Sequence, residues 1–130
     1  QEHVELSLTP ISEIESGEFV RLEADTPLQS ARQALVSAQV TEAYVCAADD
    51  QLIGKVDIHR LAQASSLTSA LDRSPVTLEA DGKLTDAMTT ASKFVGESIP
   101  VVHQGRLVGA LSEGDIFNKV LQIQASLRQQ

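Results

Sequence analysis

Two polar side chains lie where an apolar run ends and a helix pattern begins. Ser112 and Asp115 are three residues apart, directly after the apolar run at residues 107–111 and before apolar residues at helical spacing. A serine hydroxyl and the free N–H groups of a helix's first turn can hold a phosphate oxygen. A carboxylate one turn on can accept hydrogen bonds from two neighbouring sugar hydroxyls. Ser-x-x-Asp also resembles a capping box, so both interpretations stay open.

No other group of residues points to catalysis or to a metal. His3, His59 and His103 are scattered along the chain, and the acidic residues are dispersed. Ser112 lacks the G-x-S-x-G spacing of a nucleophile elbow, and neither a P-loop nor G-x-G-x-x-G occurs. We therefore expect no catalytic residue, no metal site and no enzymatic activity.

The sequence repeats itself. Residues 22–31 align with 78–87, and residues 52–56 align with 107–111, so the second copy is one residue shorter between these blocks. Each copy has a short strand pattern, a helix with Asp25 or Asp81 as the expected N-cap, two further strand patterns and a second helix. This predicts an α/β (α+β) fold of two β-α-β-β-α units. Because one unit leaves a sheet face uncovered, we expect the two to pack about a pseudo-twofold axis.

The predicted organisation has five segments. They are a lead-in (1–16), a first repeat (17–64), a linker or short helix (65–73), a second repeat (74–123) and a polar, solvated tail (124–130). The second repeat should begin with a strand at 76–78 and contain a hairpin of residues 99–102 and 106–111.

Composition excludes several classes of partner. The chain has 130 residues and a formal net charge of -8, so it lacks the basic field that attracts nucleic acid or anionic lipid. No apolar stretch approaches the roughly 20 residues of a membrane span. Cys46 is the single cysteine, which excludes an intrachain disulfide and suggests a cytoplasmic location.

The segment 97–117 carries a family resemblance. It contains Ile99-Pro100-Val101-Val102, a turn, Leu107-Val108-Gly109-Ala110-Leu111, and then Ser112-Glu113-Gly114-Asp115. This is similar to the CBS family pattern of a Pro-Val strand, a turn, Leu-Val-Gly, two apolar residues, Ser or Thr, two variable residues and Asp. The resemblance extends from about residue 10 to residue 121. It implies a tandem CBS pair, or Bateman module, that forms a homodimer and is not catalytic.

The resemblance also implies a ligand site. In nucleotide-binding CBS pairs the matching Ser or Thr and Asp hold phosphate and ribose, which gives these roles to Ser112 and Asp115. The implied base-flanking residues are Ile99, Pro100 and Val101, with Thr77 and Leu78 nearby. AMP, ADP or ATP is the expected regulatory ligand, and no cofactor is required.

The first repeat departs from this pattern. Asp57 replaces the Ser or Thr, and Arg60 replaces the ribose-binding Asp. Asp57 can cap a helix but would repel a phosphate, and Arg60 offers only donors. A nucleotide site centred on the first repeat is therefore not expected. Arg60 could form a surface ion pair or reach a phosphate across the expected pseudo-twofold interface.

The sequence of residues 94–102 also resembles that of the cytoplasmic tail of prokaryotic ClC-family chloride channels and transporters. The predicted function is sensing an adenine nucleotide and controlling an attached effector, first of all a chloride channel or transporter. The chain would then be the cytoplasmic, soluble part of an inner-membrane protein. A magnesium or cobalt efflux protein and a free-standing CBS protein are the other possible contexts. The alternative function is a ligand-free module that dimerises or scaffolds its host.

Overall fold

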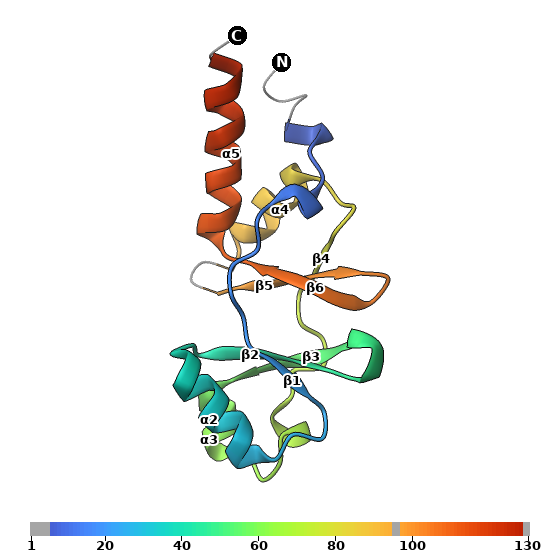
Figure 1. Ribbon diagram of the computed structural model, residues 1–130, viewed down its shortest axis with the longest axis vertical. Helices are drawn as coiled ribbons and strands as arrows, with labels where there is room; N and C mark the ends of the chain where they lie inside the picture. The colour runs from blue at the N-terminus through green and yellow to red at the C-terminus, as the bar shows by residue number, and fades with distance from the viewer. Residues whose placement is uncertain (1–5, 95–96, 129–130) are drawn as a thin grey trace. The chain divides into compact units, whose positions relative to one another are not determined.

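The computed structural model describes residues 6–94 and 97–128 (Figure 1). Val95 and Gly96, which belong to the segment that resembles ClC tails, lie outside the described residues, as do the first five and last two residues of the predicted lead-in and tail. The elements are η1 (Ile11–Glu13), β1 (Arg21–Glu23), α2 (Leu28–Ala38), β2 (Glu42–Cys46), η2 (Ala48–Asp50), β3 (Leu52–Asp57), α3 (Ile58–Gln63), η3 (Thr68–Ala70), β4 (Leu78–Glu79), α4 (Leu84–Ala91), β5 (Ile99–His103), β6 (Arg106–Leu111) and α5 (Glu113–Arg128).

Two three-stranded sheets are built in the same way. In the first, β2 pairs in parallel with β1 and antiparallel with β3. In the second, β5 pairs in parallel with β4 and also neighbours β6. Each sheet is accompanied by helices, so the structure confirms the predicted mixed α/β fold class (Figure 1).

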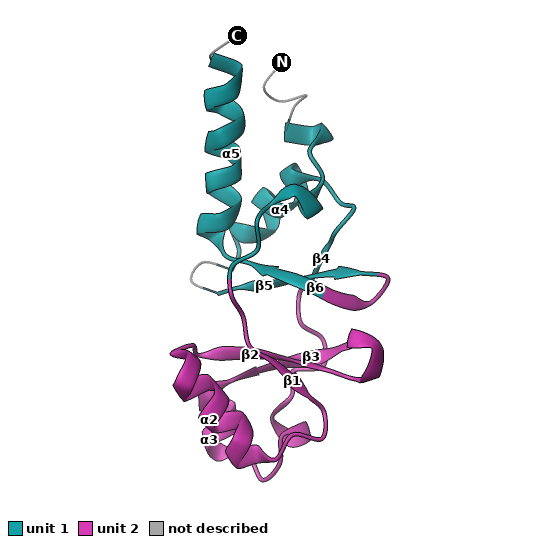
Figure 2. Cartoon of the chain, in the orientation of Figure 1, with its two compact units in different colours: residues 1–17, 77–103, 108–130 teal, residues 18–76, 104–107 magenta. Residues whose placement is uncertain are grey.

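The chain divides into two compact units that do not follow chain order (Figure 2). Unit 1 comprises residues 1–17, 77–103 and 108–130, and unit 2 comprises residues 18–76 and 104–107. The lead-in is part of unit 1 because its backbone pairs with the β4–α4 connection. The N–H of Ile11 donates to the carbonyl of Gly82, and that of Ser12 donates to Ala80, both at 2.8 Å. The pseudo-twofold packing of the repeats stays a prediction.

Each unit has an aliphatic core. In unit 1 the apolar stripes of α4 and α5 supply fully buried residues such as Leu84, Ala87 and Ile116. In unit 2, Leu35 of α2 and Leu61 of α3 do the same. Burying one large aliphatic side chain contributes about 1.5–3 kcal/mol, so these stripes fix the helices on their sheets.

The helix starts correct one prediction. Asp25 and Asp81 lie in turns, whereas the N-cap positions of α2 and α4 are Pro27 and Lys83. A proline fits here because its fixed φ suits the entry to a helix. At α4 the carboxylate of Asp86 accepts a hydrogen bond from the Lys83 N–H at 3.4 Å. An acidic residue three positions after the N-cap can accept the N-cap N–H, so the helix start does not need an aspartate at the N-cap itself.

The hairpin and the final helix position the predicted site. Gln104 and Gly105 have φ of 53° and 81°, the positive values of a type I′ turn, and they join β5 to β6 as predicted. Helix α5 continues to Arg128, so the expected polar tail is helical as far as the structure describes it. Ile123 is buried in the core of unit 1 and Leu127 is partly buried against it, so the last turns of α5 pack on unit 1.

Candidate functional site

Ser112 and Asp115 form a reciprocal capping box at the start of α5. The Asp115 N–H donates to Ser112 Oγ at 3.1 Å, and the Ser112 N–H donates to Asp115 Oδ2 at 2.8 Å. The side chain of Asp115 is therefore held in one orientation. Its other oxygen, Oδ1, has no hydrogen-bond partner within residues 6–94 and 97–128. A carboxylate oxygen has two acceptor sites, so Asp115 keeps capacity for an external hydroxyl group.

Ser16 fastens the lead-in to the neighbouring strand. Its hydroxyl donates to the Ala110 carbonyl at 2.8 Å and accepts from the Ala110 N–H at 2.9 Å. A glycine at position 109 leaves room for this close approach, because a Cβ there would lie only 3.1 Å from Ser16 Oγ. The same arrangement occurs in unit 2, where the backbone of Asp72 pairs with Lys55 beside Gly54. The two glycines thus mark where the segment preceding each repeat crosses the last strand of a sheet.

A polar cavity of about 340 Å³ lies in unit 1, between the lead-in and the start of α5. This volume is within the roughly 300–1,000 Å³ common for ligand pockets. Asp115 lines it, and its Oδ2 would be 3.6 Å from a Cβ placed on Gly17. The remaining lining is formed by Glu13, Glu15, Ser16, Asn118, Lys119 and Gln122.

A second cavity of about 180 Å³, also within unit 1, is mostly apolar. Ser16 lines both cavities, so the apolar space adjoins the polar one at this residue. Val108 of β6 lines the apolar cavity although 56 % of its surface is exposed. An exposed valine at a cavity offers a flat apolar ring a surface to cover. The other apolar lining residues include Ile11, Ile14, Ala80, Val101 and Leu111.

The structure places the predicted site residues in different surroundings. Asp115 lines the polar cavity and Val101 the apolar one. Ser112 is exposed and caps α5. Thr77 is exposed just before β4. The remaining three are buried. Leu78 and Ile99 belong to the core of unit 1, and Pro100 follows Ile99 in β5.

Sequence reasoning missed the lead-in side of the site. Glu13, Glu15 and Ser16 are about one hundred positions from Asp115 in the chain, and no local motif connects them with it. Lys119 was overlooked because it reads as part of a solvated helix face, yet it lies one turn after Asp115 and lines the same cavity. The one available signal was that Gly54 and Gly109 occupy matching positions, which indicates close approach of another segment.

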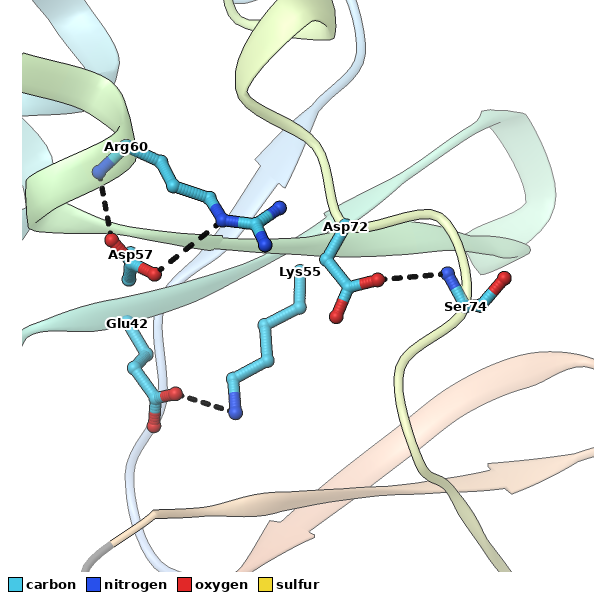
Figure 3. Close-up of polar contacts among 6 residues, drawn as sticks. All are labelled: Glu42, Lys55, Asp57, Arg60, Asp72 and Ser74. Carbon is cyan, nitrogen blue, oxygen red and sulfur yellow. Dashed lines mark hydrogen bonds and ion pairs between the residues drawn. The ribbon is translucent and has the colours of Figure 1, made fainter. Parts of the chain in front are cut away.

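The matching position in unit 2 has a different chemistry (Figure 3). Asp57 Oδ1 accepts the N–H of Arg60 at 2.8 Å, so Asp57 caps α3. The guanidinium of Arg60 lies 3.8 Å from Asp57 Oδ2, in a half-exposed ion pair. Both carboxylate oxygens therefore face a donor of the same chain. Lys55 pairs with Glu42 on the neighbouring strand. The surface ion pair expected for Arg60 is present.

Within residues 6–94 and 97–128, no three or more His, Cys, Asp or Glu side chains gather closely enough to hold a metal ion. Within the same residues, no helix has the length and apolarity needed to cross a membrane.

Residues 68–122 match the family model of the CBS domain. No curated protein sequence matches the chain. Solved structures do, among them CBSX2 of Arabidopsis thaliana in complex with AMP, with 20 % identity, a TM-score of 0.76, and coverage of 89 % of this chain and 98 % of that one. The CBS domain pair of protein MJ0100, in complex with 5′-methylthioadenosine and S-adenosyl-L-methionine, has 18 % identity and a TM-score of 0.69, with 88 % and 98 % covered.

The soluble part of a magnesium transporter has 18 % identity and a TM-score of 0.77, with 93 % of this chain and 51 % of that one covered. These likenesses show the fold. Together with the family match in the second repeat, they support a tandem CBS module, as the resemblance predicted.

Proposed function

We propose that this chain is a regulatory CBS-pair module that senses an adenine nucleotide or a related adenosine compound in unit 1. The base occupies the apolar cavity beside Val101 and Val108, and the ribose hydroxyls bind Asp115. The 5′ substituent extends into the polar cavity, where Lys119 lies. The observation that carries this proposal is the unpartnered Oδ1 of Asp115 in a polar cavity that shares Ser16 with an apolar one.

The chemistry of the two cavities supports this assignment. A purine ring needs apolar surface, a ribose needs acceptors for its two hydroxyls, and the cavities present these features in that order. Two structural neighbours form complexes with AMP and with 5′-methylthioadenosine and S-adenosyl-L-methionine, and all three compounds contain adenosine. CBS-pair modules are generally regulatory rather than catalytic, which supports the expectation that the chain is not an enzyme.

An attached effector follows from the kind of module. A ligand can shift a conformational equilibrium only by binding one arrangement more tightly than another, so a sensor needs a partner domain that reads this shift. The neighbour that is the soluble part of a magnesium transporter supports a transporter as one effector class. A chloride channel rests on the resemblance of residues 94–102 alone. Homodimerisation is part of the same proposal.

Isothermal titration calorimetry of the chain with adenosine, AMP, ADP and ATP, with and without Mg²⁺, tests the ligand. We expect saturable binding of at least one of them, and a loss of roughly tenfold to a hundredfold in affinity in Asp115→Ala, because hydrogen bonds to a charged group contribute about 1.5–3 kcal/mol. Asp57→Ala is the matched control, since it also removes a helix cap but lies in the first repeat.

Affinity that is unchanged in Asp115→Ala would refute the site. If no compound binds and none raises the melting temperature at millimolar concentration, the ligand-free scaffold becomes the better explanation. Ser112 and Asp115 would then serve only to cap α5.

A further inference from the structure

The polar cavity carries an excess of negative charge. Its lining contains the three carboxylates of Glu13, Glu15 and Asp115 and the single ammonium group of Lys119, a formal net charge of two negative units. Glu13 ends η1 and Glu15 follows it in the lead-in, and both side chains are exposed. Neither has an ion-pair partner within the described residues, so no cation in these parts of the chain neutralises their charges through an ion pair.

This charge discriminates among adenosine compounds by what they carry at the 5′ position. A phosphate group would bring up to two further negative charges into a cavity that already has an excess of them. A neutral thioether would bring none, and a sulfonium would bring a positive charge that the carboxylates attract. We propose that the site, if it binds adenosine as argued above, prefers neutral or cationic 5′-substituted adenosine compounds to nucleotide phosphates. Glu13 and Glu15 are the residues that determine this specificity.

The size of the effect follows from exposure and screening. If two carboxylates are taken to lie about 7 Å from a doubly charged phosphate in water, Coulomb repulsion at physiological salt predicts about a fivefold weaker affinity. At about 0.01 M ionic strength the Debye length rises to about 30 Å, and the same repulsion predicts about a twentyfold weaker affinity. The discrimination should therefore grow as salt is lowered, which hydrogen-bonding or steric selectivity would not do.

The variant Glu13→Gln/Glu15→Gln tests the role of these charges while keeping the shape of both side chains. Glu79→Gln is the matched control, because Glu79 is an exposed carboxylate of unit 1 on β4 that lines neither cavity. The dissociation constants of adenosine, AMP and S-adenosylmethionine are measured by calorimetry for the three proteins at low and physiological salt.

We expect the wild-type chain to bind S-adenosylmethionine most tightly and AMP least tightly. In the double variant AMP should gain about fivefold, S-adenosylmethionine should lose affinity, and adenosine should change little. AMP that binds as tightly as adenosine in the wild type, or an equal gain in Glu79→Gln, overturns this inference and leaves the adenosine site in place. AMP that becomes the tightest ligand only when Mg²⁺ is added also overturns it, because the carboxylates would then be acting through a cation. Failure of all three compounds to bind overturns the proposed function as well.

Discussion

The capping box at the start of α5 makes a measurable contribution to stability that does not depend on any ligand. Ser112→Ala removes the acceptor of the Asp115 N–H, and Asp115→Ala removes the acceptor of the Ser112 N–H. Loss of an N-cap acceptor costs about 1 kcal/mol, and loss of a negative charge from the first helical turn adds about 0.3–1 kcal/mol. We expect the free energy of unfolding to fall by about 1 kcal/mol in Ser112→Ala and by about 1.5 kcal/mol in Asp115→Ala.

A double-mutant cycle measures the reciprocity of the box. Because each bond holds the turn in the geometry that the other needs, the double variant should lose about 0.5 kcal/mol less than the sum of the single variants. Urea unfolding without ligand gives these values, and a loss of 1 kcal/mol should lower the melting temperature by about 3–5 °C for a chain of this size.

Glu113→Gln is the control for the cycle, because Glu113 is acidic and lies in the same first turn but takes no part in the box. Its free energy of unfolding should fall only by the small contribution of one negative charge in the first helical turn. If Ser112→Ala and Asp115→Ala are both as stable as the wild type, or no less stable than Glu113→Gln, the capping interpretation is refuted. Any loss of ligand affinity in Asp115→Ala would then reflect direct binding alone.

Three further predictions concern packing and burial. In Gly54→Ala the new Cβ would lie 2.5 Å from the backbone oxygen of Asp72, so we expect a loss of about 2–3 kcal/mol in urea unfolding, and a smaller loss in Gly109→Ala, where a side-chain hydroxyl can move aside. Arg32→Ala removes three hydrogen bonds that link α2 to α3, two from the guanidinium to the Leu61 carbonyl at 2.9 and 2.7 Å and one to the Ala62 carbonyl at 3.4 Å. We expect this to cost about 1.5–3 kcal/mol in urea unfolding. Burial raises the pKa of the Cys46 thiol, and the nearby Arg21 guanidinium opposes this in part. The protonated thiol therefore contributes stability below its unfolded-state pKa, and this contribution is lost as pH rises through the higher folded-state pKa. The free energy of unfolding, measured from neutral to alkaline pH, should show this decrease, and Cys46→Ala should make the decrease smaller.

Much of the fold could be predicted from the sequence because the repeat gives each pattern twice. The hairpin formed by β5 and β6 was expected over nearly the observed residues, since two short apolar runs flank a Gln-Gly turn. The helix starts were misplaced because Asp25 and Asp81 are favourable caps that the chain uses in turns instead. Local propensity gives the type of element more reliably than its first residue.

The candidate site was only half visible in the sequence. Asp115 could be identified because its chemistry and its capping geometry are encoded within four residues. Glu13, Glu15 and Ser16 could not, because they reach the site only through the pairing of the lead-in with the β4–α4 connection and with β6. Backbone pairing between distant segments leaves little trace in composition. The matching glycines at positions 54 and 109 were its one mark in the sequence.

Capping and ligand binding do not compete at Asp115, although the sequence presents them as alternatives. The capping bond uses Oδ2 and leaves Oδ1 without a partner in the described chain, so a hydroxyl can bind while the box stays intact. The box also fixes the carboxylate in advance, which reduces the entropy that a ligand must remove on binding. At Asp57 the cap uses Oδ1 and the Arg60 guanidinium lies 3.8 Å from Oδ2, so both oxygens face a donor of the same chain. The repeats differ at two positions, Asp57 against Ser112 and Arg60 against Asp115, and we propose that this pair of differences separates a repeat that binds a sugar from one that does not.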